Sequence, residues 1–346
     1  MKYADLMLPH GTLYADNSTK TPVLLMAAEA MKNSLWSGAD CQTALSKSIN
    51  HIAKLVGVKA ESVRVYPCLE DAVSAIRNKL LPVLCVHKIF ISDDSRAVFW
   101  NEFGKLALYT TPIPIRWDSG DLEDGEWDTA STDALVSFPH VSAFSGQSHW
   151  SNIVNTKTKA WVVVDGSDAV GHMPVNLKEI PCDYYMCSGS LMYGPPCGVV
   201  VMNSARARGA GLKDVPTDAI FSTACGLGVA AEFLMSRGMD RIQTHESELT
   251  VHLRTDGIGR FAGLRVLGRG RADLPVVCVD VPAETPDEFY KKLTADGLDV
   301  SCGTHGCPES HKSMRCTGSV RVSLGWYHEL DDVTEIVRIF KKNVPH

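Results

Sequence analysis

The stretch from Trp161 to Asn203 constrains the fold of this chain more than any other, because it holds three short apolar runs separated by turn-forming residues. The runs cover residues 161–164, 183–187 and 198–202. Each is too short for a helix and is bounded by turn formers, so all three are predicted to be buried strands. Asp165 follows the first run and Ser188 follows the second. Polar groups at the carboxyl ends of neighbouring strands are where an open α/β sheet places its ligand.

Strand and helix patterns alternate over the first two thirds of the chain, which predicts a mostly parallel sheet covered by helices on both faces. The further strands are predicted at residues 63–66, 83–87, 107–110 and 135–138, and the helices at 40–56, 69–80 and 94–105. Thr21 followed by Pro22 is typical of the first residues of another helix.

The pattern changes after about residue 216. Helices are predicted at residues 226–237, 240–254, 285–296 and 331–342, with strands at 275–281 and 320–324. The last helix has its acidic residues at the start and two lysines at the end, as the helix dipole favours. We therefore expect a large domain over residues 1–215 and a smaller α+β domain over residues 216–346.

Composition limits the possible partners of the chain. The net charge of −6 argues against a nucleic-acid or membrane-surface partner, and no apolar run is long enough to span a membrane. The N-terminal residues have no apolar signal core and are not arginine-rich, so no targeting peptide is expected. The 11 cysteines are scattered without a CxxC pair, which is typical of a reducing compartment such as the cytoplasm or an organellar matrix.

One motif points to a family. Residues 188–195 read Ser-Gly-Ser-Leu-Met-Tyr-Gly-Pro, and they resemble the S-G-H-K-L-Y-G-P motif of class V aminotransferases and cysteine desulfurases. The segments at 14–22 and 226–249 resemble the same family, so the likeness covers nearly the whole chain. It implies the fold of the fold type I pyridoxal-phosphate (PLP) enzymes, with a mostly parallel sheet in a large α/β domain and a small α+β C-terminal domain. It also implies a homodimer.

The resemblance assigns family roles to several positions. Asp165 matches the acid that pairs with the pyridine nitrogen of PLP, Ser188 matches a phosphate contact, and Asp168 stands for a glutamine near the ring oxygen. Arg321 matches the arginine that binds the substrate carboxylate. The nucleophile of the desulfurases falls on Gly306, one residue from Cys307. Ala143 replaces an asparagine, and the stacking histidine has no clear counterpart near residues 92–95.

Leu191 occupies the position of the lysine that binds PLP covalently in this family. A leucine has no amine and cannot form that bond. The phosphate-binding loop is also altered, since Pro67 has no N–H, Cys68 replaces a glycine, and Glu70 brings a negative charge. These substitutions predict that the chain has no cofactor, and that the cofactor-binding and substrate-binding positions are vestigial.

Three functions follow as hypotheses. The first is a catalytically inactive homologue with a structural or protein-interaction role, as a homodimer or a heteromer with a related protein. The alternative is a PLP-dependent cysteine desulfurase or C–S lyase that uses a non-standard lysine, for which Lys20 and Lys178 are candidates. The third is a metal site that would be built from Cys302, His305, Cys307, His311 and Cys316. Their spacing matches no standard zinc motif, so no metal is expected.

Overall fold

The computed structural model describes residues 5–8, 11–36, 41–82, 88–106, 109–116, 121–268 and 272–345. Its main feature is a seven-stranded sheet with the strand order β2-β8-β7-β6-β5-β3-β4. The strands are β2 (Val63–Tyr66), β3 (Lys88–Ser92), β4 (Thr110–Ile113), β5 (Ala134–Pro139), β6 (Trp161–Asp165), β7 (Tyr184–Ser188) and β8 (Gly198–Met202). The five strands from β7 to β4 are parallel, and β8 lies antiparallel between β7 and β2. The prediction of a mostly parallel sheet is therefore confirmed.

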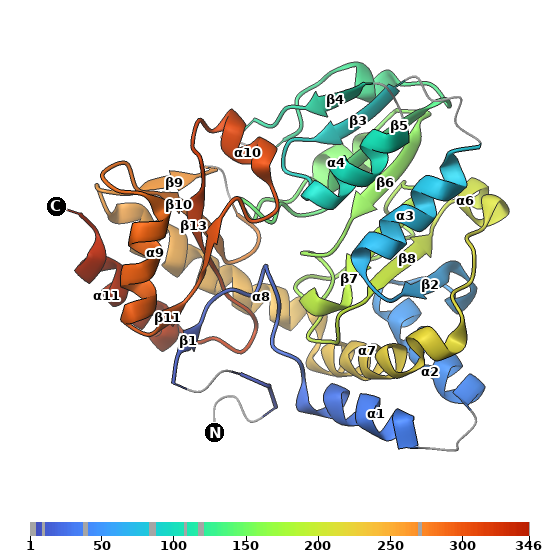
Figure 1. Ribbon diagram of the computed structural model, residues 1–346, viewed down its shortest axis with the longest axis horizontal. Helices are drawn as coiled ribbons and strands as arrows, with labels where there is room; N and C mark the ends of the chain where they lie inside the picture. Colours follow the sequence, from blue (N-terminus) through green and yellow to red (C-terminus); the bar gives the residue numbers. More distant parts are fainter. Residues whose placement is uncertain are drawn as a thin grey trace.

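Helices cover both faces of this sheet, and the strand sequences explain why (Figure 1). Alternate residues of β6 pack into different apolar clusters, with Val162 and Val164 on one face and Trp161 and Val163 on the other. A strand buried on both faces must be apolar throughout. The helices of the large part are α1 (Leu25–Trp36), α2 (Cys41–Leu55), α3 (Leu69–Leu80), α4 (Ala97–Phe103), α5 (Trp150–Asn155), α6 (Ala205–Ala210) and α7 (Thr217–Arg237).

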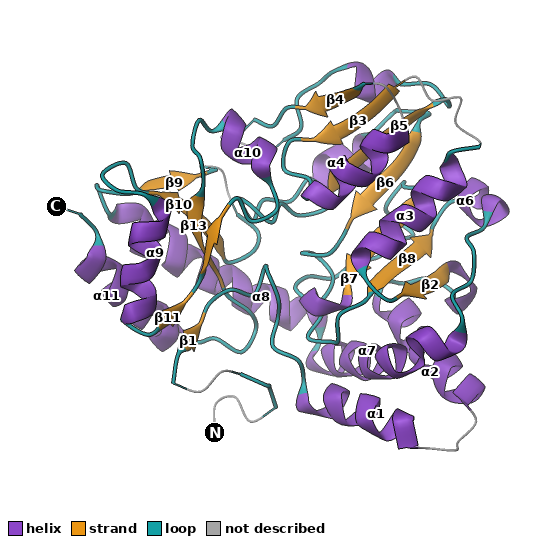
Figure 2. Cartoon of the chain, in the orientation of Figure 1, coloured by secondary structure: helices purple, strands orange, loops and turns teal. Residues whose placement is uncertain are grey.

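A four-stranded antiparallel sheet forms the C-terminal part, in the order β12-β13-β10-β9. Figure 2 shows it beside the large sheet, with its own helices packed against it. The strands are β9 (Arg265–Leu267), β10 (Val276–Asp280), β12 (Ser301–Gly303) and β13 (Ser319–Ser323), and the helices are α8 (Met239–Thr250), α9 (Pro286–Ala295), α10 (Pro308–Ser313) and α11 (Leu330–Asn343). The domain boundary at residues 215–216 stays a prediction.

The N-terminal segment joins the two parts of the molecule. Strand β1 (Leu13–Tyr14) pairs with β11 (Leu298–Asp299) of the C-terminal part. The prediction that Thr21 caps a helix is wrong, because α1 begins four residues later. The Thr21 hydroxyl instead donates to the carbonyl of Ser190 at 2.9 Å and accepts from the amide of Tyr193 at 2.7 Å. Thr21 therefore fixes the N-terminal segment against the turn that contains Leu191.

Other elements differ from the predictions in informative ways. The predicted strand at 83–87 lies outside the described residues, and β3 at 88–92 was not predicted. Helix α7 begins nine residues before the predicted helix and ends, as predicted, before Gly238. The predicted helix 240–254 changes at Val251 into a π-helix, Val251–Gly257. Among the described residues only α7 is long and apolar enough to cross a membrane, and half of its apolar window is buried, as in a core helix.

Candidate functional site

The predicted acidic residues lie together at the carboxyl ends of the parallel strands. Asp165 ends β6 and is 2% exposed, and Asp168 follows in the next turn, also buried. One oxygen of Asp165 accepts from the amide of Ser167 at 3.0 Å. The Ser167 hydroxyl accepts from the amide of Ser188 at 3.1 Å, which joins the turn after β6 to the end of β7. The structure thus brings Asp165, Asp168 and Ser188 into one cluster.

Arg96 pairs with both of these acidic side chains. It precedes α4, and its Nε lies 3.1 Å from Oδ2 of Asp165 while its Nη2 is hydrogen-bonded to Oδ2 of Asp168. Burial raises the pKa of Asp165, and the guanidinium opposes that rise. An arginine that bridges two buried carboxylates holds both of them in place. Sequence reasoning missed Arg96, although it directly follows residues 92–95, where the family's stacking histidine was sought.

Leu191 lies in the turn that follows β7, as the motif predicted. It closes a short 3-10 helix, Gly189–Leu191, and its side chain is 3% exposed. Gly189 and Gly194 pack tightly here, because a Cβ at Gly189 would lie 2.5 Å from the Cys197 sulfur and one at Gly194 would lie 2.8 Å from a Leu227 methyl. The turn therefore holds residue 191 in a defined, buried position that provides no amine.

The altered phosphate loop is placed at the start of α3, as predicted. Cys68 caps the helix, and its sulfur accepts from the amide of Asp71 at 3.4 Å. The side chain of Glu70, however, is exposed to solvent. Its repulsion of a bound phosphate is therefore screened by water and is weaker than the sequence suggested.

Arg321 is 1% exposed and lies at the centre of β13, between Ser301 of β12 and Cys278 of β10. Its Nη1 donates to the Ala143 carbonyl at 3.1 Å, and its Nη2 donates to the Thr19 hydroxyl at 2.6 Å. The Nε atom is buried without a hydrogen-bond partner among the described residues. The sequence assigned Arg321 to substrate carboxylate binding, and a buried guanidinium with an unused donor is suited to that role.

Cys307 is fully buried and immediately precedes the first residue of α10. Its sulfur lies 3.5 Å from the carbonyl of Asp94, and the preceding Gly306 carbonyl accepts from the amide of Ala97 at 2.6 Å. Burial raises the pKa of the thiol to about 12, against the opposing charges of Arg96 and Arg321. The thiol thus lies close enough to both arginines for their charges to act on it, and it is neutral at physiological pH.

The Cys and His side chains considered for a metal site make separate contacts. His305 and His311 both hydrogen-bond to the Ser319 hydroxyl, at 3.0 and 2.9 Å. Cys302 lies 3.6 Å from an Asp287 oxygen. Across the described ranges, no three His, Cys, Asp or Glu side chains are grouped closely enough to hold a metal ion. Burial and Arg321 lower the pKa of His305 to about 2, so its ring is neutral.

Two buried histidines line the strand ends beside this cluster and were not predicted. The Nε2 of His149 lies 2.7 Å from Oδ2 of Asp94, and both side chains are almost fully buried. His140 stacks on Trp150 with ring centroids 5.8 Å apart, and its Nδ1 is 2.8 Å from the Tyr185 hydroxyl. Burial lowers the pKa of His140 to about 4, so this ring is neutral. The sequence holds no local signal for these contacts, because the partners are 45 and 55 residues apart.

Asp93 provides a pH-dependent test of the electrostatics at this edge. Burial, together with the carboxylates of Asp94 and Glu309, raises the pKa of Asp93 to about 7. In the unfolded chain this carboxyl releases its proton near pH 3.9. The free energy of unfolding therefore falls as the pH rises from about 4 to 7, and it is constant above about pH 7. We expect Asp93→Asn to raise the free energy of unfolding by about 1–2 kcal/mol at pH 8, allowing for solvent screening, and by less at pH 5.

Urea denaturation of the wild type and the Asp93→Asn variant at both pH values measures this difference. The exposed Glu29 of α1 offers a control, and Glu29→Gln is expected to change stability at neither pH. A gain from Asp93→Asn that is the same at both pH values would contradict the raised pKa.

The sheet topology and the acid at the end of β6 define an α/β protein of fold type I, the fold of PLP-dependent enzymes. An apo cysteine desulfurase from Thermococcus onnurineus NA1 superposes with a TM-score of 0.86 at 21% identity, over 98% of this chain and 96% of that one. The family model for aminotransferase class-V matches residues 92–211 and 216–336. The chain therefore belongs to the aminotransferase class-V family.

Relatives with similar sequences bear the names of cysteine desulfurases. A probable cysteine desulfurase from Halalkalibacterium halodurans is 27% identical over 280 residues, which cover 72% of this chain and 68% of that protein. The probable cysteine desulfurase 1 of Mycobacterium leprae is 24% identical over 207 residues, 53% of this chain and 34% of the relative. This chain thus spans about two thirds of the first relative and about a third of the second.

Family membership corrects the expectation that the chain has no cofactor. Class V aminotransferases and cysteine desulfurases depend on PLP, so PLP is the cofactor to be expected for this chain. The residues at the site fit PLP in part. Ser188 is available to the phosphate, and Asp165 is in place at the end of β6, but Arg96 already pairs with Asp165 and Leu191 supplies no amine. The site therefore fits PLP that is held without a covalent bond to residue 191.

Proposed function

We propose that this chain is a PLP-dependent protein of amino-acid sulfur chemistry, acting on a small amino acid as a cysteine desulfurase or C–S lyase. The observation that carries this proposal is the convergence of Asp165, Arg321 and Cys307 from three separate segments on one site. Cys307 lies close enough to Arg96, Arg321 and Asp168 for their charges to affect its pKa. The names of the similar proteins support the same chemistry.

Each residue would have a role that its surroundings allow. The unused Nε of Arg321 would bind the substrate carboxylate. PLP would supply the electron sink that weakens bonds at the substrate α-carbon. The Cys307 thiol would attack the sulfur of the substrate cysteine, whose bond to the β-carbon breaks; a persulfide stays on Cys307, the thiol proton passes to the β-carbon, and alanine is released. A buried thiol reacts slowly, so the loop before α10 must expose Cys307 during the reaction.

The lysine that this chemistry needs must come from a position other than 191. Lys178 lies at the opposite end of the sheet, in a cavity with Gly57 and Asn203. Lys20 is exposed and follows Thr19, whose hydroxyl contacts Arg321. Of the two lysines named from the sequence, Lys20 is therefore the better candidate for an amine that reaches the site.

The test compares two exposed lysines under the same conditions. The protein is incubated with PLP and L-cysteine, alanine and sulfide are measured, and a second sample is reduced with borohydride and mapped by peptide. We expect a PLP adduct on Lys20 and a loss of turnover of about 100-fold or more in Lys20→Ala, because the amine is then absent. The matched Lys178→Ala should keep both activity and adduct. Activity that survives in Lys20→Ala would contradict the role of this lysine.

The second candidate function is a catalytically inactive homologue with a protein-interaction role. The buried Leu191 and the pairing of Arg96 with both Asp165 and Asp168 favour it. The same experiment separates the two candidates. Turnover of L-cysteine with PLP would exclude the inactive homologue, whereas reversible PLP binding with no lysine adduct and no product would exclude the enzyme.

A further inference from the structure

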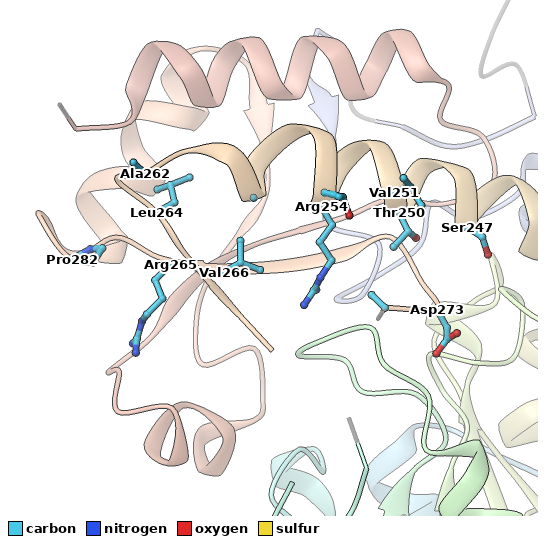
Figure 3. A pocket seen from close by; sticks show the side chains of 13 residues that line it. Ser247, Thr250, Val251, Arg254, Ala262, Leu264, Arg265, Val266, Asp273 and Pro282 are labelled. Atoms are coloured by element: carbon cyan, nitrogen blue, oxygen red, sulfur yellow. The ribbon is translucent and has the colours of Figure 1, made fainter. Parts of the chain in front are cut away.

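A second cavity lies in the C-terminal part, away from the strand ends that hold Asp165. It has a volume of about 780 Å³ and is bounded by α8, the π-helix Val251–Gly257 and β9. This volume is typical of sites that bind small organic molecules. Figure 3 shows its labelled residues, with Arg254 extending from the helix into the space between Val266 and Asp273.

Arg254 is the unusual side chain of this cavity. It is 92% buried, with only 8% of its surface exposed. Its Nη1 donates to the carbonyls of Ser145 and Val276, at 3.1 and 3.3 Å, while its Nη2 is buried without any hydrogen-bond partner in the described part of the chain. Buried arginines are normally paired with a carboxylate, because an uncompensated buried charge is strongly destabilising. Arg254 makes no ion pair with any described residue.

The other charged side chains of the cavity are already engaged. Arg265 lies 2.7 Å from an Asp280 oxygen, so its charge is compensated. Asp273 accepts a hydrogen bond from the amide of Ser148 at 3.0 Å. Burial lowers the pKa of Arg254, as expected where no anion offsets the loss of hydration. Among the described residues that line it, the cavity therefore has one uncompensated cation, and the negative charge of Asp273 on its wall disfavours a dianion.

A π-helix carries Arg254 to this position. In the α-helix before it, the backbone turns every 3.6 residues, whereas the wider turn of Val251–Gly257 inserts an extra residue. Single π-helical turns occur frequently at functional sites, because they cost stability and are retained for what they position. Gly257 ends the turn, and a Cβ there would lie 2.5 Å from a Val337 methyl of α11. The end of the π-helix is thus closely packed against α11.

We propose that this cavity binds a small organic monocarboxylate, with the carboxylate on Nη2 of Arg254 and the apolar body against Val251, Leu264 and Val266. One unpaired guanidinium donor matches one carboxylate, and the aliphatic side chains supply a surface that excludes water from it. The proposal concerns a site separate from the PLP site, so its outcome is independent of the function proposed above.

Calorimetric titration of the full chain with three probes tests the site. Octanoate has both the charge and the apolar tail, octanol has the tail alone, and inorganic phosphate has the charge alone. We expect saturable binding of octanoate, at about one per chain, at least about tenfold tighter than that of octanol or phosphate, because the charged hydrogen bond and the apolar contact both contribute. Equal binding of octanol, or tighter binding of phosphate, would overturn the proposal.

Three variants locate the binding. Arg254→Gln should weaken octanoate binding by about tenfold or more. Val251→Trp leaves Arg254 in place and should block the cavity from an exposed position. Arg260 is exposed and lies six residues from Arg254. Arg260→Gln removes the same charge outside the cavity, so it is the matched control and should bind octanoate as the wild type does. If Arg254→Gln is too unstable to titrate, the Val251→Trp variant tests the proposal instead. Unchanged octanoate binding in Val251→Trp would overturn it.

Discussion

Replacing Leu191 by lysine is expected to give a chain that binds PLP covalently, at about one PLP per chain, whereas the wild type has no covalent bond at this residue. Leu191 is 3% exposed and is held in the turn after β7, so a lysine there is buried near Asp165. Burial lowers the pKa of a lysine amine, which keeps it neutral and nucleophilic. Borohydride reduction followed by peptide mapping should identify the modified residue 191.

The control for this experiment is Leu191→Met, which preserves the apolar volume and adds no amine. It should show the same PLP behaviour as the wild type. The lysine variant is expected to lose about 1–3 kcal/mol of stability, because a polar group enters an apolar site. A folded Leu191→Lys protein with no adduct at residue 191 would show that the turn does not point this position toward the cofactor site.

The second large effect is expected at the buried pair of His172 and Glu246. His172 follows the turn after β6, Glu246 lies on α8, and Nδ1 of the imidazole is 3.0 Å from Oε2 of the carboxylate. Glu246 raises the pKa of His172 even though burial opposes the charge. The pair joins the two parts of the molecule. Breaking a buried pair from one side costs about 3–5 kcal/mol, so Glu246→Ala should lower the free energy of unfolding by about that amount at pH 6.

This loss should depend on pH in a known direction. The imidazole pKa is raised in the folded state, so once Glu246 is ionised the pair stabilises the fold up to about pH 6.5, and its contribution falls as the pH passes the raised value. Denaturant unfolding of Glu246→Ala and the wild type over this range measures the effect. Glu248 lies on the same helix and is exposed, so Glu248→Ala is the control and should cost less than about 0.5 kcal/mol.

Individual strands and helices were predictable where the pattern of apolar residues follows directly from burial. The runs at 161–164 and 198–202 are apolar at every position because both faces of these strands are covered, and such runs are recognisable without the fold. The helix at Leu330–Asn343 was predicted to within one residue, since its apolar face and terminal charges agree. Strand β3 is as long as β6, and it was missed because it begins with an exposed lysine.

The candidate site was predictable in its residues and not in its contacts. The motif around Leu191 identified the family and the missing amine, and it placed Asp165 and Ser188 at strand ends. It did not show that Arg96 would pair with Asp165 and Asp168, 69 and 72 residues away. Nor did it show that the Cys307 thiol would be fully buried.

The sequence alone therefore determined the α/β class, the family and the absence of an amine at residue 191, because these depend on residue type and on the periodicity of apolar positions. Only the tertiary structure decided which charges are compensated. Arg96 forms ion pairs with two carboxylates, whereas Arg254 forms none with the described residues. The physical reason is that ion pairing depends on distances of a few ångströms between segments far apart in the chain, and the crossovers of the sheet and the packing of the two parts set those distances.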